Sequence, residues 1–248
     1  QTEANRTSFE NWQTIRFLNA TNTLQDVVFA NVYRGFFPAA DQGASTTFDT
    51  VKSRRVITGG LYASSTANFT ISNMDITDID DEKHIRLFNY NATTTLINSS
   101  FDTAKLEFNG SGIGAVERAF TLDLKVVDTS NVPISGATVN LTDINDTEIF
   151  DFTTDGSGLI GQQTVTTDVF NYANPSGITA NTFTLTVSKA GKITSSQTLD
   201  IQAAQNFSVV LAGECDPDGT DPAYPMRVDT TLDPSTQDAV ITVWSANP

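Results

Sequence analysis

The feature that most constrains the fold of this chain is a near absence of helical periodicity. No stretch of about a dozen residues carries the i, i+3, i+4, i+7 apolar stripe of an amphipathic helix. Short runs that alternate apolar and polar residues recur instead, separated by Gly, Asn, Asp and Ser. Because side chains alternate between the two faces of a strand, this pattern predicts an all-β protein.

Residues 1–115 contain similar segments in which a polar lead precedes a short apolar strand. These segments begin at Asn19, Ser65 and Asn91. One solenoid coil has roughly 20 to 26 residues. Leu24 and Ile71 are two such lengths apart, and Ile71 and Leu96 are one length apart. We therefore predict a β-solenoid-like domain here and keep a β-sandwich as the alternative. The pattern resembles the irregular parallel β-helix of prokaryotic surface proteins.

Residues 109–114 hold three glycines and mark the predicted domain boundary. Beyond it, residues 116–213 show the clearest strand pattern, with Phe120, Leu122 and Leu124 alternating with polar residues. Turn residues separate about six or seven such strands, which predicts a β-sandwich of the immunoglobulin or transthyretin type.

A family resemblance becomes specific in this second domain. Residues 126–142 read VVDTSNVPISGATVNLT, and residues 153–159 read TTDGSGL. Both stretches resemble carboxypeptidase-regulatory-like domains, which are transthyretin-like sandwiches widespread in bacterial and archaeal envelope proteins. The resemblance covers about 95 residues and implies a spacer or interaction module without catalytic residues. On the residues alone, Pro133 and Gly136 shape one turn, while Gly156 and Gly158 permit the next.

Residues 214–248 are predicted to form an acidic loop followed by a strand. The loop carries carboxylates in the pattern D-x-D-G-x-D, with one more beside it: Glu214, Asp216, Asp218 and Asp221. Hard cations take several carboxylate oxygens, so calcium is a candidate ligand. The pattern lacks the later glutamate of an EF-hand, and a solvated acidic turn is the alternative.

The terminal strand has an apolar face that must be buried against something. Its apolar residues include Val240, Ile241, Val243 and Trp244. A strand at the end of a chain either closes its own sheet or completes the sheet edge of a neighbour. We therefore predict these residues as a candidate assembly strand, with copies of the chain itself as partners.

The charge balance excludes one class of partner. The chain has 29 acidic and 14 basic residues, for a net charge of −15. Nucleic acid binding needs the opposite sign, because its affinity comes from cations that displace counterions. No apolar run has the roughly 20 residues that span a bilayer, so no membrane insertion is expected. The chain begins at Gln1, as expected of a mature chain without its leader or of an excised piece.

The glycosylation pattern Asn-x-Ser/Thr is frequent in this chain. It occurs at Asn5, Asn19, Asn68, Asn91, Asn98, Asn109, Asn140, Asn145 and Asn206. Glycan acceptors must be exposed, and this frequency predicts a glycosylated, extracellular protein. The alternative is that Asn and Thr simply cover the surface of a β-protein.

Few residues in the chain are suited to catalysis. His84 is the only histidine, so no multi-histidine zinc site can form, and we expect it to be packed or on the surface. Cys215 is the only cysteine, which excludes an internal disulfide. Residues 78–82 form a second acidic cluster, the pair Asp143 and Asp146 is weaker as a cation site, and Arg54 begins the densest basic spot.

These observations lead to three hypotheses about function. The first is a structural subunit of a prokaryotic surface assembly, such as a filament, sheath or S-layer, that is not an enzyme. The second is an adhesin or carbohydrate-binding surface protein, with glycans or other envelope proteins as partners. Its candidate aromatic residues are Trp12, Tyr33, Tyr62, Tyr90 and Tyr172. The third is a β-helix carbohydrate-active enzyme, which the scarcity of basic residues disfavours.

Overall fold

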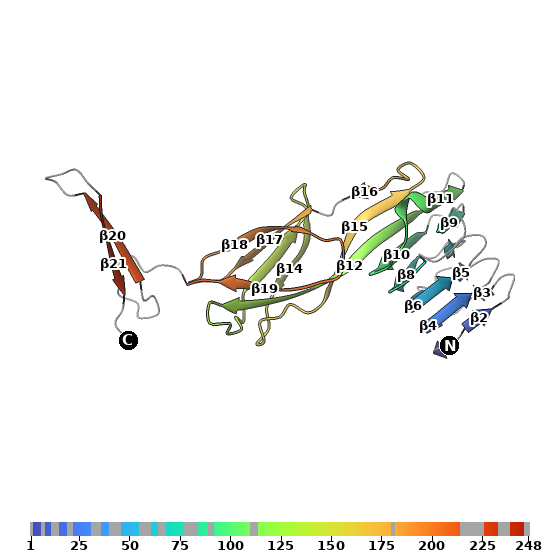
Figure 1. Ribbon diagram of the computed structural model, residues 1–248, viewed down its shortest axis with the longest axis horizontal. Helices are drawn as coiled ribbons and strands as arrows, with labels where there is room; N and C mark the ends of the chain where they lie inside the picture. Colours follow the sequence, from blue (N-terminus) through green and yellow to red (C-terminus); the bar gives the residue numbers. More distant parts are fainter. Residues whose placement is uncertain are drawn as a thin grey trace. The chain divides into compact units, whose positions relative to one another are not determined.

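The fold is known from a computed structural model, which describes part of the chain (Figure 1). The described residues are 2–5, 8–10, 15–18, 22–30, 36–39, 46–54, 61–63, 68–76, 84–88, 92–109, 114–179, 182–213, 226–232 and 239–245. They form twenty-one strands, β1 to β21, and one 3₁₀ helix, η1, at Thr103–Lys105. The prediction of an all-β fold is confirmed. None of the helices in these ranges is long and apolar enough to cross a membrane.

The chain divides into two compact units that are discontinuous in sequence. The first unit comprises Gln1–Leu122, Gln162–Phe183 and Asp200–Gln205. The second comprises Asp123–Gly161, Thr184–Leu199 and Asn206–Pro248. The sequence predicted other ranges, 1–115, 116–213 and 214–248, and these ranges stay predictions.

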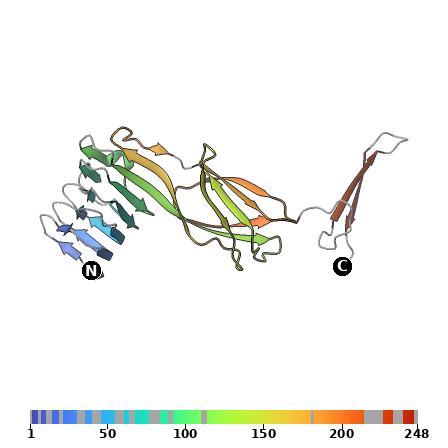
Figure 2. The same ribbon diagram turned by 180° about the vertical axis from the view of Figure 1, so that it is seen from behind.

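The first unit is a parallel β-solenoid, and its coils stack one on the next (Figures 1 and 2). One parallel sheet contains β1 (Thr2–Asn5), β4 (Asn22–Ala30), β6 (Thr46–Arg54), β8 (Phe69–Ser72), β10 (Thr93–Ile97) and the start of β12 (Ala115–Asp128), with β2 (Ser8–Glu10) beside β4. The other contains β3 (Ile15–Leu18), β5 (Phe36–Ala39), β7 (Leu61–Ala63), β9 (Ile85–Phe88) and β11 (Leu106–Asn109). Consecutive strands beyond β2 alternate between the sheets, so each coil adds one strand to each sheet. Of the two alternatives for this region, the solenoid is therefore correct.

The spacing of apolar residues in the sequence corresponds to one column of this solenoid. Leu24 pairs in register with Phe48, Phe48 pairs with Ile71, and Ile71 pairs with Leu96. Ile71 and Leu96 are fully buried. Stacked coils share a core in this way, because one coil alone cannot cover its own apolar face.

Three successive coils each have one residue in the left-handed conformation: Thr50 inside β6, Asn73 directly after β8 and Asn98 directly after β10. Thr50, Asn73 and Asn98 have φ values of 53°, 54° and 49°. Asn tolerates this conformation better than most residues, because its short side chain can form local hydrogen bonds. Asn98 binds the next coil twice, since its Nδ2 donates to Thr121 Oγ1 (3.0 Å) and its Oδ1 accepts from the Thr121 N–H (2.9 Å).

The parallel ladder ends where strand β12 meets an antiparallel partner. Residues 115–119 of β12 pair parallel with β10, so the solenoid continues past the glycine-rich segment 109–114. On its other side β12 pairs antiparallel with β15 (Gln163–Asn171), which pairs in turn with the short β16 (Ile178–Thr179).

The second unit contains an antiparallel β-sandwich. Its four-stranded sheet has the order β14 (Glu148–Thr153), β13 (Thr138–Thr142), β17 (Thr182–Ser188) and β18 (Ser195–Asp200). Strand β19 (Gln205–Leu211) pairs with β12 in another sheet. The residues between the layers are fully or almost fully buried: Leu124, Val126, Val139, Leu141, Leu185, Val187 and Leu211. The sandwich predicted from alternating residues is confirmed.

Three loops of the second unit share one geometry. In each, an aspartate Oδ1 accepts hydrogen bonds from the second and fourth backbone N–H groups that follow it. These aspartates are Asp128, Asp143 and Asp155. The third residue after each has positive φ: Asn131 (63°), Asp146 (60°) and Gly158 (76°). This is the three-residue hairpin loop with a left-handed closing residue, so one local rule builds three turns.

The remaining described strands, β20 (Met226–Leu232) and β21 (Ala239–Ser245), form an antiparallel hairpin. The predicted terminal strand therefore exists as β21. It pairs with β20 of the same chain. Its use in assembly stays a prediction.

Candidate functional site

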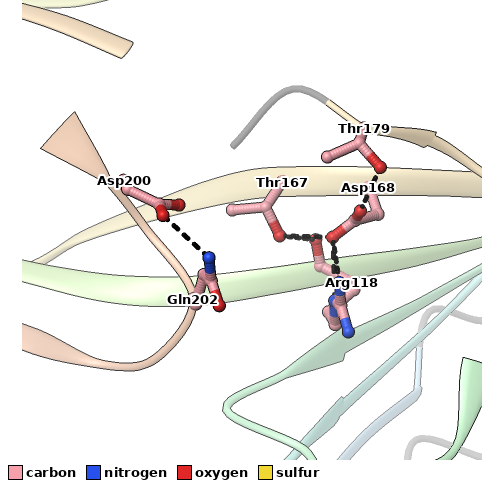
Figure 3. Close-up of polar contacts among 6 residues, drawn as sticks. All are labelled: Arg118, Thr167, Asp168, Thr179, Asp200 and Gln202. Atoms are coloured by element: carbon pink, nitrogen blue, oxygen red, sulfur yellow. Dashed lines mark hydrogen bonds and ion pairs between the residues drawn. The ribbon is translucent and has the colours of Figure 1, made fainter. Parts of the chain in front are cut away.

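A buried carboxylate on β15 is the centre of a network of side-chain hydrogen bonds in the first unit (Figure 3). The Asp168 side chain is only 3% exposed. Its Oδ2 accepts from Arg118 Nε (2.8 Å), Arg118 Nη2 (2.7 Å) and Thr167 Oγ1 (2.8 Å). Its Oδ1 accepts from Thr179 Oγ1 (2.9 Å). These four bonds compensate the burial of the charge.

A β-bulge explains why these groups meet. Arg118 pairs across the ladder with Asp168, but the next residue, Ala119, pairs with Thr166. Thr167 is therefore the extra residue of β15. Bulges re-aim side chains, and here the hydroxyl of Thr167 turns to the carboxylate beside it in the chain. Cross-strand pairs of opposite charge also stabilise the ladder.

Arg118 is one of the residues that line an open depression of about 460 Å³. The depression is lined by the corner after β10, by β12 and by the loop between β18 and β19. Its lining includes Ser100, Phe101, Phe120, Gln202 and Ala203. The Arg118 side chain is 29% exposed, so the ion pair lies at the boundary between core and solvent.

Aromatic contacts hold the guanidinium in place. Arg118 Cζ lies 6.0 Å from the ring centroid of Phe170, within the range of a cation–π interaction. Phe101, which lines the depression, meets Phe170 edge to face with ring centroids 6.3 Å apart. On the loop beyond β18, Gln202 Nε2 donates to Asp200 Oδ2 (2.7 Å), which fixes the orientation of that amide (Figure 3).

This arrangement offers fixed hydrogen-bond donors next to apolar rings. A guanidinium carries five N–H donors, of which Asp168 takes two. No other hydrogen bond from Arg118 to a described residue is present in the structure. Such a surface is suited to binding a polar ligand.

The predicted calcium residues cannot be placed, because Glu214, Asp216, Asp218 and Asp221 lie outside the described residues. Cys215 and residues 78–82 also lie outside them. Within the described ranges, no group of three or more His, Cys, Asp or Glu side chains is arranged to hold a metal ion.

The predicted glycosylation residues fall into three groups. Asn68, Asn145 and Asn206 are exposed. Asn98, Asn109 and Asn140 are half-buried, and their amides donate to Thr121, Glu107 and Glu148. The side chains of Asn5, Asn19 and Asn91 are outside the described set. Whether any of the nine carries a glycan stays a prediction.

The only histidine is part of the solenoid packing. His84 is 4% exposed, and its Nδ1 accepts a hydrogen bond from the backbone N–H of Asp102 (3.0 Å). Its own backbone N–H donates to the Lys105 carbonyl (2.8 Å). Of the aromatic candidates for glycan binding, Tyr172 is exposed, while the side chains of Trp12, Tyr33, Tyr62 and Tyr90 are outside the described set, as is that of Arg54.

Sequence reasoning missed Arg118 and Asp168 altogether. The two residues are 50 positions apart, and no motif surrounds either of them. The one available signal is the polar run Thr166, Thr167 and Asp168 inside an otherwise alternating strand. It marks a break in the pattern but does not identify the partner.

The chain matches no protein-family model and no curated protein. Among solved structures, it is similar to a catechol 1,2-dioxygenase of Acinetobacter radioresistens, with 13% identity, a TM-score of 0.29, and coverage of 40% of this chain and 53% of the dioxygenase. A 3-chlorocatechol 1,2-dioxygenase of Rhodococcus opacus 1CP has 10% identity, a TM-score of 0.27, and coverage of 39% and 60%. The Bacillus anthracis TIE protein has 13% identity, a TM-score of 0.29, and coverage of 56% and 28%. This chain therefore spans less than two thirds of each of them, and likenesses this low carry no argument about its function.

Proposed function

We propose that this chain is a structural subunit of an extracellular prokaryotic surface assembly, such as a filament, sheath or S-layer. Its copies join through the edges of their sheets. The observation that carries the proposal is that the four-stranded sheet of the second unit ends at β14 and β18, and neither strand pairs with a further described strand on its outer side.

Both edges offer groups that another strand can bind. An unpaired edge presents a row of backbone N–H and C=O groups. On β14, Ile149 and Phe152 are 40% and 41% exposed. Just before β18, Ile193 is 51% exposed, but its backbone N–H already donates to the Ala212 carbonyl (2.9 Å). The β14 edge therefore combines unpaired backbone with apolar side chains that a partner strand would cover, while β18 offers the unpaired backbone of its outer side.

The directions of the two edge strands favour an open assembly. Strand β13 is antiparallel to both β14 and β17. Strands β17 and β18 are joined by the short segment 189–194, which is too short for the crossover that parallel neighbours need. Strands β14 and β18 therefore run in opposite directions. A copy shifted sideways without rotation places its β14 antiparallel to β18, and such head-to-tail contacts do not close on themselves.

The acidic charge acts against this association. A net charge of −15 repels other copies, and salt or divalent cations screen that repulsion. The proposal accordingly keeps calcium at Glu214, Asp216, Asp218 and Asp221 as a candidate bridging ion. It also keeps β21, with Val240, Ile241, Val243 and Trp244, as a candidate second contact. The proposal assigns no catalytic activity to the chain.

The test compares an edge variant with a matched control. Ile149→Lys/Phe152→Lys places two cations on the β14 edge at side chains that are already partly exposed. Val132→Lys/Val210→Lys, at exposed positions in the loop after β12 and on β19, adds two cations outside this sheet. Electron microscopy and sedimentation velocity, with and without calcium, should show assemblies of the wild type and the control only. A wild type that stays strictly monomeric in both conditions would contradict the proposal.

A further inference from the structure

We propose that the depression beside Arg118 binds a neutral saccharide. This site is independent of the sheet edges and goes beyond the role in assembly. The inference rests on the hydrogen-bonding capacity of Arg118, on the polar and aromatic groups around it, and on the charge of the pair it forms with Asp168.

Arg118 supplies donors that are held rigidly and not used up. Its Nε and Nη2 bind the Asp168 carboxylate, which leaves three of its five N–H groups without a hydrogen bond to any described residue. Arg118 lines the depression and its side chain is 29% exposed, and we infer that these N–H groups serve a ligand there. Because Asp168 and Phe170 fix the plane of the guanidinium, little side-chain entropy is lost when a ligand binds.

The other groups at the depression complete a surface suited to a sugar. Phe101 and Phe120 provide apolar ring surface. Gln202 donates through Nε2 to Asp200, so its Oε1 is left to accept from a hydroxyl. A sugar hydroxyl both donates and accepts, and the apolar face of a sugar ring packs on aromatic side chains. The volume of about 460 Å³ lies within the usual range for small-molecule sites.

Charge decides between a neutral and an acidic ligand. Asp168 neutralises Arg118 at a distance of 2.7 Å, so the site offers hydrogen-bond donors without net positive charge. The chain as a whole has a charge of −15, which repels an anion on approach. A carboxylate ligand would also compete with Asp168 for the guanidinium. A neutral polyhydroxylated ligand needs no net positive charge at the site, is not repelled by the acidic chain and does not compete with Asp168.

The experiment measures glycan binding and then blocks the depression with a large side chain. The full chain is applied to an array of neutral and acidic glycans, and the glycans it retains are measured by titration calorimetry. Ala203→Trp places a large side chain in the depression at an exposed loop position. Ala190→Trp, at an exposed position in the turn before β18, is the matched control. Gln202→Ala removes one acceptor and should weaken binding by roughly two- to tenfold.

The proposal expects neutral glycans to be retained, Ala203→Trp to abolish binding and Ala190→Trp to preserve it. Circular dichroism confirms that each variant folds as the wild type does. Three results would overturn the proposal: no glycan binds the wild type, Ala203→Trp binds as well as Ala190→Trp, or only acidic glycans bind. Assembly is measured separately, so a failure here leaves the test of the sheet edges unaffected.

Discussion

Replacing Gly158 by alanine should lower the free energy of unfolding of the sandwich more than the same replacement at the nearby Gly156 or Gly161. Gly158 closes the loop that begins at Asp155, and its φ of +76° lies in the left-handed region. A Cβ at this position would overlap the carbonyl oxygen of Val126, a backbone atom that cannot rotate away. An alanine at this position would therefore have both an unfavourable backbone conformation and a steric overlap.

The expected loss in the free energy of unfolding is the sum of these two effects. The left-handed conformation costs a non-glycine residue about 1–2 kcal/mol. Relieving the overlap requires the loop to move away from β12. That movement weakens the bond from the Val126 N–H to the Gly158 carbonyl (2.8 Å) and the bond from the Ile134 N–H to the Val126 carbonyl (2.9 Å). At about 1 kcal/mol for each bond, Gly158→Ala should lower the free energy of unfolding by about 3–4 kcal/mol.

Two nearby glycines separate the contributions. Gly161 has a φ of +72° but nothing within 4 Å of an added Cβ, so Gly161→Ala should cost only the conformational part, about 1–2 kcal/mol. Gly156 has neither a positive φ nor a neighbour within 4 Å, and Gly156→Ala should be stabilising by about 0.4–1 kcal/mol through the unfolded state.

The assay is urea denaturation followed by circular dichroism, with hydrogen exchange of the Val126 and Ile134 amides as a local measure. Intrinsic tryptophan fluorescence is unsuitable, because Trp12 and Trp244 both lie outside the sandwich strands. Exchange at both amides should accelerate in Gly158→Ala and change less in Gly161→Ala. If the two variants lose the same stability, the contact with the Val126 oxygen contributes nothing and the reasoning is refuted.

Three further predictions concern individual side chains. Arg118→Met should lower the free energy of unfolding, measured with denaturant, by about 3 kcal/mol, because it leaves the Asp168 charge buried without its ion-pair partner. Adding Asp168→Leu should restore most of that loss, and a double variant no more stable than Arg118→Met would contradict this. A hydrogen bond from the Thr147 backbone N–H lowers the pKa of Asp143 below its usual 3.8, against a smaller opposing effect of desolvation. The stabilisation from Asp143 should therefore be complete above pH 3.8 and disappear as the pH falls through the lowered pKa, and a carboxyl titration by NMR with a midpoint at or above 3.8 would disprove it. Intact mass and peptide mapping of native protein should find a glycan at exposed Asn145 before Asn98, whose Nδ2 already donates to a neighbouring coil; modification of Asn98 alone would contradict this order.

The solenoid was predictable where its coils repeat and obscure where they do not. Leu24, Ile71 and Leu96 were identified from their spacing, and the structure stacks them. The coil that contributes Phe48 was not recognised, because the segment before its strand does not resemble the polar segments of the other three coils. Residues in the left-handed conformation, such as Thr50, bend the chain without a glycine and leave no clear mark in the sequence.

The candidate binding site was not predictable at all. Sequence patterns reveal periodicity within one strand, whereas Arg118 and Asp168 meet only because the bulge at Thr167 shifts the register of β15. A single extra residue turns every following side chain to the opposite face. The pairing therefore depends on a three-dimensional register that alternation alone does not encode.

The two units treat their sheet edges differently, and this difference bears on assembly. Past β12, the parallel ladder of the solenoid ends in β15 and then in the two-residue β16, a short edge that offers a partner little to bind. The edges of the sandwich sheet, β14 and β18, are each six residues long, and neither contains a lysine or a proline. Natural proteins usually protect long edges with such residues, with bulges or with covering segments, and of these devices β14 has one bulge, at Ile149. Because this chain closes one edge and leaves two long ones uncovered by any described strand, association at β14 and β18 is the expectation that the architecture favours.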